Sequence, residues 1–258
     1  MTDALILEKR GPVATITLNN PPANTWTTES LNHLEQIIHD LNADRKIVSL
    51  VIVSDSSKFF SAGADLKQFA SGDKARAAEA AQAFGRAFEA LTDFRGVSIA
   101  AINGYAMGGG LEVALACDLR IAGDQAVMAL PEASVGLLPC AGGTQNLTLL
   151  VGEGWAKRMI LCGERVDAEQ ALKIGLVEEV VVGEELRTRV LALAEQVSRQ
   201  SPDSIMACKQ LVQMGRSLPS RQVLPAEREL FLALFDGANQ QEGVNAFLEK
   251  RAPEWHYD

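Results

Sequence analysis

The hydrophobic pattern in the first half of the chain switches repeatedly between short apolar runs and longer stretches with helical spacing. The runs Leu5–Glu8 and Val13–Leu18 flank a Gly-Pro pair, which predicts a β-hairpin. A helix is expected from the Thr-Thr-Glu opening at Thr27 to about Ala43, with apolar residues three and four apart. The β-branched run Ile47–Val53 is typical of a strand buried on both faces.

The alternation continues to about residue 130 and then gives way to helical patterns. A loop with a short helical turn is expected over residues 54–73. The further elements expected up to residue 130 are Lys74–Leu91 (helix), Val97–Ile102 (strand), Leu111–Cys117 (helix), Leu119–Ala122 (strand) and Ala126–Ala129 (strand). Those expected beyond it are Thr144–Val151, Glu153–Leu161, Asp167–Lys173, Glu184–Gln200, Pro202–Gln213, Val223–Phe235 and Asn239–Arg251 as helices and Val177–Val182 as a strand. No strand is expected after Val182, and the shift to a purely helical pattern near residue 200 predicts an α/β core over residues 1–200 and a helical C-terminal region over residues 201–258.

Composition narrows the class of protein. The 258 residues suit one large domain, and the 47% hydrophobic and 22% charged residues are ordinary for a globular protein. No apolar run is long enough to span a bilayer, and the first residues do not resemble an export signal, so we expect a cytoplasmic protein without membrane contact. The net charge of −9, without a basic cluster, disfavours nucleic acid as a partner.

The sequence lacks the residue patterns that several common kinds of functional site require. The four cysteines form no CxxC pair, and the three histidines are scattered, so a metal centre is not expected. A GxSxG sequence is absent, which disfavours a Ser-His-Asp triad. The chain has neither GxGxxG nor GxxxxGK[ST], so the sequence does not support a nicotinamide cofactor or a P-loop nucleotide site.

Two glutamates interrupt apolar surroundings. Glu112 lies on a helix whose other side chains are apolar or absent, so the helix is expected to be buried and the pKa of Glu112 raised, as a general acid or base requires. A glutamate that points to solvent or pairs with an arginine explains the pattern equally well. Glu132 follows a strand and Pro131, and on its own pattern it is better explained as an acid at a helix start.

Two small-residue segments are candidates for close approach of a ligand. Gly108-Gly109-Gly110 joins a strand to a helix, where free N–H groups can hold an anion. Ser61-Ala-Gly63-Ala64-Asp65 follows another buried strand. Tight strand–helix packing explains the first equally well, and an ordinary turn capped by Asp65 explains the second.

The order of these segments is more specific than any one of them. The motifs Phe60-Ser-Ala-Gly-Ala-Asp-Leu, Ala101-Ile-Asn-Gly-Tyr-Ala-Met-Gly-Gly-Gly-Leu-Glu, Cys117-Asp-Leu-Arg-Ile-Ala, Leu130-Pro-Glu-Ala-Ser-Val-Gly-Leu and Gly142-Gly-Thr-Gln together resemble the crotonase, or enoyl-CoA hydratase/isomerase, family. The resemblance extends from Val13 to the C-terminal Lys250-Arg-Ala-Pro. It implies a crotonase-like spiral of ββα units with a helical C-terminal region that assembles into homotrimers or hexamers, each hexamer a dimer of trimers.

The resemblance also implies roles for particular residues. The N–H groups of Ala64 and Gly109 match an oxyanion hole that stabilises a thioester enolate. Glu132 matches the residue that delivers a proton to the α-carbon, and Glu112 one that orients or deprotonates water. The positions that match the substrate groove and its border are Asn24, Ala62, Asp65, Leu66, Gly108, Pro131 and Cys140.

The two matching glutamates favour hydration of a trans-2-enoyl-CoA to a 3-hydroxyacyl-CoA, because isomerases of the family often keep only the second. Coenzyme A is then part of the substrate, and no separate cofactor or metal is expected. Double-bond isomerisation or another acyl-CoA lyase reaction is the alternative, and a non-catalytic or RNA-binding relative is a distant one. Cys140 and Trp26 depart from the common pattern: Cys140 is either a small packing residue or a nucleophile, and Trp26 either packs in the core or narrows the acyl pocket.

Overall fold

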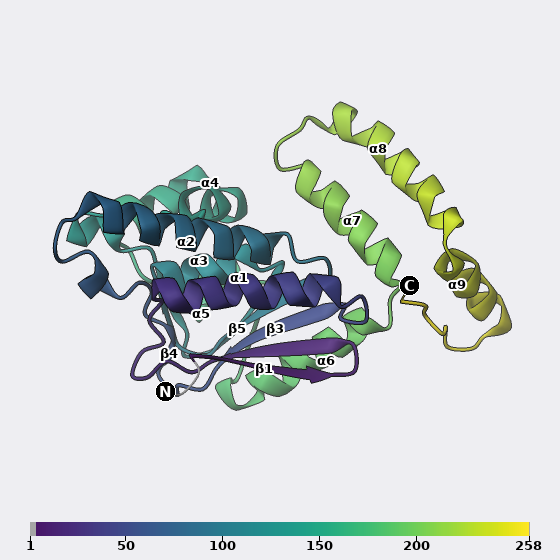
Figure 1. The fold of residues 1–258 in the computed structure, drawn as a ribbon, viewed down its shortest axis with the longest axis horizontal. Helices are drawn as coiled ribbons and strands as arrows, with labels where there is room; N and C mark the ends of the chain where they lie inside the picture. Colours follow the sequence, from purple (N-terminus) through teal and green to yellow (C-terminus); the bar gives the residue numbers. More distant parts are fainter. Residues whose placement is uncertain (1–3, 258) are drawn as a thin grey trace.

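The computed structural model describes residues 4–257 and shows an α/β core from which a group of helices projects (Figure 1). The larger sheet has six strands in the order β1-β2-β3-β5-β7-β10, and the smaller has four in the order β4-β6-β8-β9. In the larger sheet β1 pairs antiparallel with β2, while the other neighbours are parallel. The strands are β1 (Leu5–Arg10), β2 (Val13–Leu18), β3 (Ser49–Ser54), β4 (Phe59–Ser61), β5 (Val97–Ile102), β6 (Tyr105–Met107), β7 (Leu119–Gly123), β8 (Val127–Ala129), β9 (Val166–Asp167) and β10 (Glu179–Val181).

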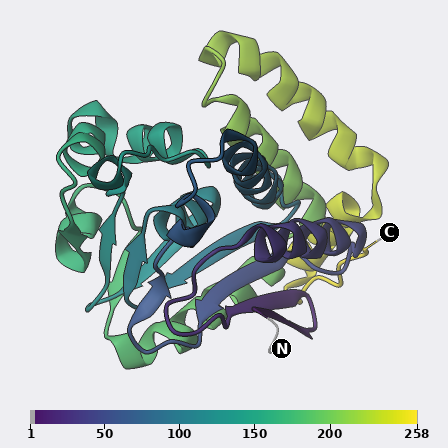
Figure 2. The same ribbon diagram turned by 60° about the vertical axis from the view of Figure 1, so that its left-hand side comes forward.

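Both faces of the larger sheet are covered. Helices α1 (Thr28–Ala43) and α6 (Leu186–Ser198) lie on opposite sides of it (Figures 1 and 2). Successive residues of a strand point to opposite faces, so Leu50 and Ile52 of β3 belong to the main core, while Val51 and Val53 pack in the cluster that includes α6. The prediction that this strand is buried on both sides is therefore confirmed.

Helix α3 (Gly109–Ala116) fills the interior between the second sheet and α2 (Lys74–Thr92), and all eight of its residues are buried. Gly110 lets strand β4 reach it: a Cβ on Gly110 would lie only 2.1 Å from the carbonyl oxygen of Ser61. The loop after β4 and the first turn of α3 are thereby held against each other.

The chain after β8 continues into two helical elements. A short 3₁₀ helix, η2 (Glu132–Val135), is followed by α4 (Gly143–Leu161), in which Gly152 has a φ of 75° and divides the helix where the sequence predicts a break. Another short 3₁₀ helix, η1 (Leu66–Gln68), follows β4, in the loop where a helical turn is expected. Helix α5 (Ala168–Lys173) leads to β10.

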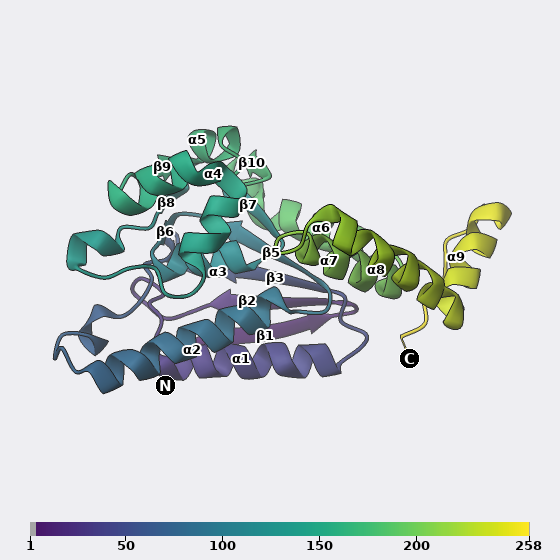
Figure 3. The ribbon, with the colours of Figure 1, turned by 90° about the horizontal axis from the view of Figure 1, so that it is seen from above.

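Helices α7 (Pro202–Met214), α8 (Ser220–Ala233) and α9 (Ala238–Glu249), with η4 (Leu234–Asp236) between the last two, extend away from the sheet (Figure 3). Lys209 fastens α7 to the core, because its Nζ donates to the carbonyl oxygens of Phe94 and Gly96 and to Asp118 Oδ2 at 2.6, 3.0 and 2.7 Å. Large apolar side chains on this region are exposed, among them Phe231, Leu232, Phe235, Phe247 and Leu248.

The structure differs from the predicted elements mainly at short strands. Strands β4 and β6 each have three residues and β9 has two, which is too short for an alternating pattern to stand out. The predicted strand Val177–Val182 is reduced to β10 (Glu179–Val181), and the N–H of Val177 donates to the carbonyl oxygen of Ala171 in α5 instead of to a neighbouring strand. Within residues 4–257, no helix combines the length and the apolar composition that crossing a membrane requires.

Candidate active site

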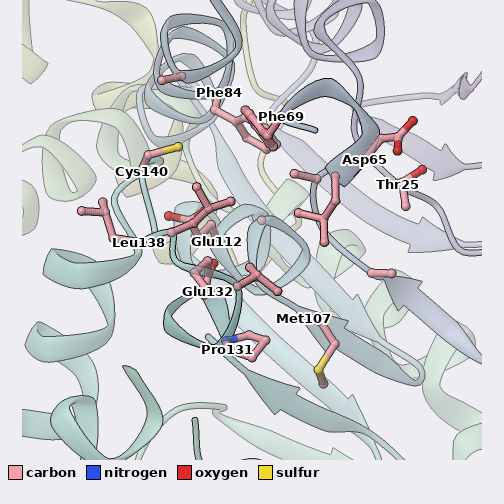
Figure 4. A pocket seen from close by; sticks show the side chains of 18 of the residues that line it. Thr25, Asp65, Phe69, Phe84, Met107, Glu112, Pro131, Glu132, Leu138 and Cys140 are labelled. Atoms are coloured by element: carbon pink, nitrogen blue, oxygen red, sulfur yellow. The ribbon is translucent and has the colours of Figure 1, made fainter. Parts of the chain in front are cut away.

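A cavity of about 760 Å³ opens between η1, α2, the first turn of α3 and the segment that runs from Pro131 to Cys140 (Figure 4). Its lining is mostly apolar, with two carboxylates, Glu112 and Glu132, among the few polar groups. A mostly apolar cavity with a few convergent polar groups is the usual form of a small-molecule site.

Glu112 lies in the first turn of α3 and is 2% exposed. Its Oε1 accepts hydrogen bonds from the backbone N–H groups of Ala141 and Gly143, at 2.8 and 2.9 Å. Burial raises the pKa of Glu112 above its ordinary value, and these two N–H donors oppose the rise. The explanation by solvent exposure or an arginine partner is wrong, because the side chain is buried and no ion pair of residues 4–257 includes it.

Glu132 begins η2 directly after Pro131 and reaches the same cavity. Burial raises its pKa to about 7; its own backbone N–H opposes the rise, and the charge of Glu112 adds to it. Both carboxyl oxygens are buried and make no well-formed hydrogen bond to any residue in the described range. Glu132 does begin a helix, as the interpretation of it as a helix-start acid proposed. That interpretation does not explain why its carboxyl group is buried without hydrogen-bond partners.

Two backbone N–H groups lie close together beside the carboxylates, since a Cβ on Gly109 would be 3.7 Å from the nitrogen of Ala64. Trp26 pairs with the residues on either side of Ala64, since its N–H donates to Gly63 at 2.8 Å and its carbonyl accepts from Asp65 at 3.0 Å. Because N–H groups alternate sides along extended backbone, the N–H of Ala64 points away from Trp26.

The second N–H belongs to Gly109, the first residue of α3, which has no partner within the helix. Among residues 4–257 neither this N–H nor that of Ala64 has an acceptor. A Cβ on Gly63 would lie 3.0 Å from the Gly109 nitrogen and 2.5 Å from the Met107 carbonyl oxygen, so a glycine is needed to bring the two donors together. Two free N–H donors, one of them at a helix start, are a kind of arrangement that can hold an oxyanion.

Most of the predicted groove residues line this cavity. They are Ala62, Asp65, Leu66, Gly108, Pro131 and Cys140. Asp65 also caps η1 through a hydrogen bond from the N–H of Lys67 at 3.1 Å, as the alternative interpretation of its segment proposed.

Asn24 is the exception, because it does not line the cavity. Its amide nitrogen donates to Ser54 Oγ at 2.8 Å and to the carbonyl oxygen of Phe60 at 3.1 Å. Its own carbonyl oxygen accepts from Ser61 Oγ at 2.6 Å. These contacts hold the loop that carries Ala64, and substrate binding by Asn24 stays a prediction.

The two departures from the family pattern lie in different places. Trp26 is 2% exposed and packs edge to face on Phe88 with ring centroids 5.6 Å apart, so it belongs to the core and does not narrow the cavity. Cys140 lines the cavity, where burial and the charges of Glu112 and Glu132 raise the pKa of its thiol to about 11. Cys140 is exposed at the cavity, and a thiol that stays protonated at neutral pH is a poor nucleophile, which disfavours the interpretation of Cys140 as a nucleophile.

Part of the lining was not identified from the sequence. It consists of Thr25, Phe69, Ala77, Ala81, Phe84, Met107 and the residues Ser134–Leu138. Positions 77, 81 and 84 have the spacing of any buried helix face, and nothing in that pattern separates a cavity wall from a core contact. No group of His, Cys, Asp and Glu side chains within residues 4–257 is arranged to hold a metal ion.

Comparison with known proteins identifies the class. Residues 8–258 match the model of the enoyl-CoA hydratase/isomerase family, and the chain belongs to this family. The predicted family, its crotonase-like fold and its enzymatic character are thereby confirmed.

Individual relatives cover nearly the whole chain. The 2,3-dehydroadipyl-CoA hydratase of Escherichia coli (strain K12) is 36% identical over 97% of this chain and 98% of its own length. The short-chain-enoyl-CoA hydratase of Clostridium acetobutylicum is 34% identical, with 96% and 95% covered. Among solved structures, Pseudomonas aeruginosa DspI is 64% identical with a TM-score of 0.97, covering 99% of this chain and 97% of that one. Enoyl-CoA hydratase from Bacillus anthracis is 32% identical with a TM-score of 0.95, covering 99% and 100%.

Proposed function

We propose that the protein is an enoyl-CoA hydratase that adds water to a trans-2-enoyl-CoA and forms a 3-hydroxyacyl-CoA. The observation that carries the proposal is the pair of buried carboxylates in one cavity with unlike surroundings, beside two free N–H donors. The hydratases named among the relatives support the same reaction. The substrate brings coenzyme A with it, and the proposed reaction uses no other cofactor.

The surroundings of the two carboxylates assign their roles. Glu112 receives two hydrogen bonds from other residues that stabilise its charged form, whereas Glu132 receives none from another residue. When the pair holds a single proton, that proton therefore resides on Glu132. Glu112 is then the base that accepts a proton from water, and Glu132 is the acid. Different environments for two titratable groups are the usual way in which one site carries both roles.

The steps follow from this assignment. The thioester carbonyl oxygen lies against the N–H groups of Ala64 and Gly109. As the water oxygen bonds to the β-carbon, its proton passes to Glu112 and the π electrons move toward the carbonyl, which becomes an enolate held by the two N–H donors. The enolate re-forms the thioester when its α-carbon takes the proton of Glu132. Proton exchange through solvent then returns the proton from Glu112 to Glu132.

Loss of the conjugated absorbance of a trans-2-enoyl-CoA tests the reaction, and its pH dependence tests the roles. We expect kcat/KM to fall about tenfold per pH unit above pH 7, because Glu132 loses its proton there. On the acid side it should fall as Glu112 becomes protonated, at a pH above the ordinary glutamate range because its pKa is raised. Because the two carboxyl groups titrate as a coupled pair, the pKa values read from the acid and alkaline sides of the profile belong to the pair and not to either residue alone. A rate that is constant between pH 5 and pH 9 would contradict the proposal, and conversion of a 3-enoyl-CoA without hydration would favour isomerisation.

We also propose that the helical region associates with other copies of the chain in a trimer or a pair of trimers. The support is the exposed apolar surface on α8, η4 and α9, where Phe231, Phe235 and Phe247 are 59%, 55% and 83% exposed. Exposed apolar patches of this kind usually mark an interface. Sedimentation equilibrium is expected to give three or six chains per particle, and a monomer at micromolar concentration would refute the assembly without affecting the proposed reaction.

A further inference from the structure

The cavity continues past the catalytic groups along one face of α2. Phe84 lies against the oxyanion site, since a Cβ on Gly109 would be 2.9 Å from the Phe84 ring. Ala81 and Ala77 line the same cavity three and seven positions earlier. Residues at this spacing share a helix face, and with a rise of 1.5 Å per residue they extend over roughly 10 Å. A track of small side chains therefore leads away from the point where the thioester is held.

The opposite wall is large and apolar. Val135 and Leu138, in and after η2, line the cavity but remain 54% and 66% exposed, and Leu66 of η1, an element that contacts α2, also lines the cavity and is 50% exposed. These side chains meet solvent at the edge of a ligand cavity, where an apolar ligand would cover them. The polar lining residues Thr25 and Asp65 lie elsewhere in the cavity, apart from Phe69 and Phe84 (Figure 4). From the thioester, the polar coenzyme and the acyl chain can therefore extend in different directions along the cavity.

We propose that the face of α2 formed by Ala77 and Ala81 seats the acyl chain and admits straight chains longer than crotonyl, a specificity that rests on the hydratase function proposed above. Alanine at both positions leaves the space that a longer chain fills, between α2 and the apolar segment Val135–Leu138. Trp26, the residue whose size first suggested a narrowed pocket, lies in the core and sets no limit here.

The test compares kcat/KM for trans-2-enoyl-CoA thioesters from crotonyl to dodecenoyl. Each methylene buried on the track is expected to raise kcat/KM about fourfold until the track is filled. Ala81→Leu places a branched side chain on the track, and it should lower the ratio of kcat/KM for dodecenoyl-CoA to that for crotonyl-CoA at least tenfold. Ala77 is farther from the thioester than Ala81. For an acyl chain of intermediate length, Ala77→Leu should therefore lower kcat/KM relative to that for crotonyl-CoA less than Ala81→Leu does.

Ala78→Leu is the matched control. Ala78 lies on the same helix one residue from Ala77, but it is exposed and does not line the cavity. It makes the same change of side chain without entering the track, so the ratio should not change. Equal ratios in Ala81→Leu and Ala78→Leu, or a wild-type protein without preference for longer chains, would overturn the proposal.

Binding of saturated acyl-CoA thioesters separates this proposal from the proposed reaction. Calorimetry with butyryl-CoA and dodecanoyl-CoA needs no hydration, and tighter binding of the longer chain, weakened in Ala81→Leu, would support the track even if no enoyl-CoA gained water. Hydration of crotonyl-CoA with equal affinity for both saturated thioesters would refute the track and leave the reaction intact. The same calorimetry also shows whether a variant that has lost activity still folds and binds ligand.

Discussion

Replacing Glu132 with glutamine is expected to lower kcat/KM for enoyl-CoA hydration by about 10²–10⁴-fold. The amide has nearly the same shape as the protonated carboxyl group but cannot release a proton to the α-carbon. The change is measured as the rate of loss of conjugated absorbance at pH 7. Glu195→Gln, which changes an exposed glutamate on α6, is the matched control and should leave the rate unchanged.

A stability measurement separates lost chemistry from lost structure in this variant. In the folded protein the pKa of Glu132 is about 7, against an ordinary value of 4.5. Folding therefore disfavours the charged form, and this cost grows as the pH rises from about 4.5 to 7 and is then constant. Glu132→Gln should raise the free energy of unfolding by about 1–2 kcal/mol at pH 8, less than the full shift implies, because the residue as a whole is only partly buried although its carboxyl oxygens are covered. At pH 4 the substitution should change the free energy of unfolding little. Normal activity in this variant would show that Glu132 is not the acid.

Replacing Glu112 with glutamine is expected to lower kcat/KM by a similar factor, about 10²–10⁴. The amide oxygen of glutamine can still accept the hydrogen bonds from Ala141 and Gly143, so the local structure should persist. The other side of the group becomes an NH₂, which cannot take a proton from water. Activity is measured across pH, because the acid limb of the profile should disappear with the base.

The double variant Glu112→Gln/Glu132→Gln sharpens this test. Both residues act on the same reaction, so their effects should not add, and the double variant should be about as slow as the slower single variant. Multiplied effects, with the double variant far below either single variant, would mean that the two carboxylates work independently. Unchanged rates in both single variants would rule out a two-carboxylate mechanism.

The elements that could be predicted from the sequence are those whose own residues decide their burial. The run that forms β3 is apolar from Leu50 to Val53, and the structure buries it from both sides. The apolar surroundings of Glu112 correctly indicated a buried helix, α3. The short strands β4 and β6 could not be predicted, because they exist through pairing with each other and with β8.

The site could be predicted only in part, for a similar reason. The pattern around Glu132 suggested a helix-start acid, since nothing local shows that Pro131 turns the chain back beside Gly108 and Glu112. The order of motifs shared with a family supplied what local physics lacked. The alanines of α2 were missed because a helix face toward a cavity and one toward the core have the same spacing.

The most direct test of the central claim is the mass of the product formed from trans-2-enoyl-CoA thioesters in ¹⁸O-labelled water. A hydratase gives a 3-hydroxyacyl-CoA that is heavier than the substrate by one labelled water molecule, and the account predicts this product with the wild-type protein and its near absence with Glu132→Gln. A product of unchanged mass, or unchanged thioesters at every chain length from crotonyl to dodecenoyl, would contradict the account.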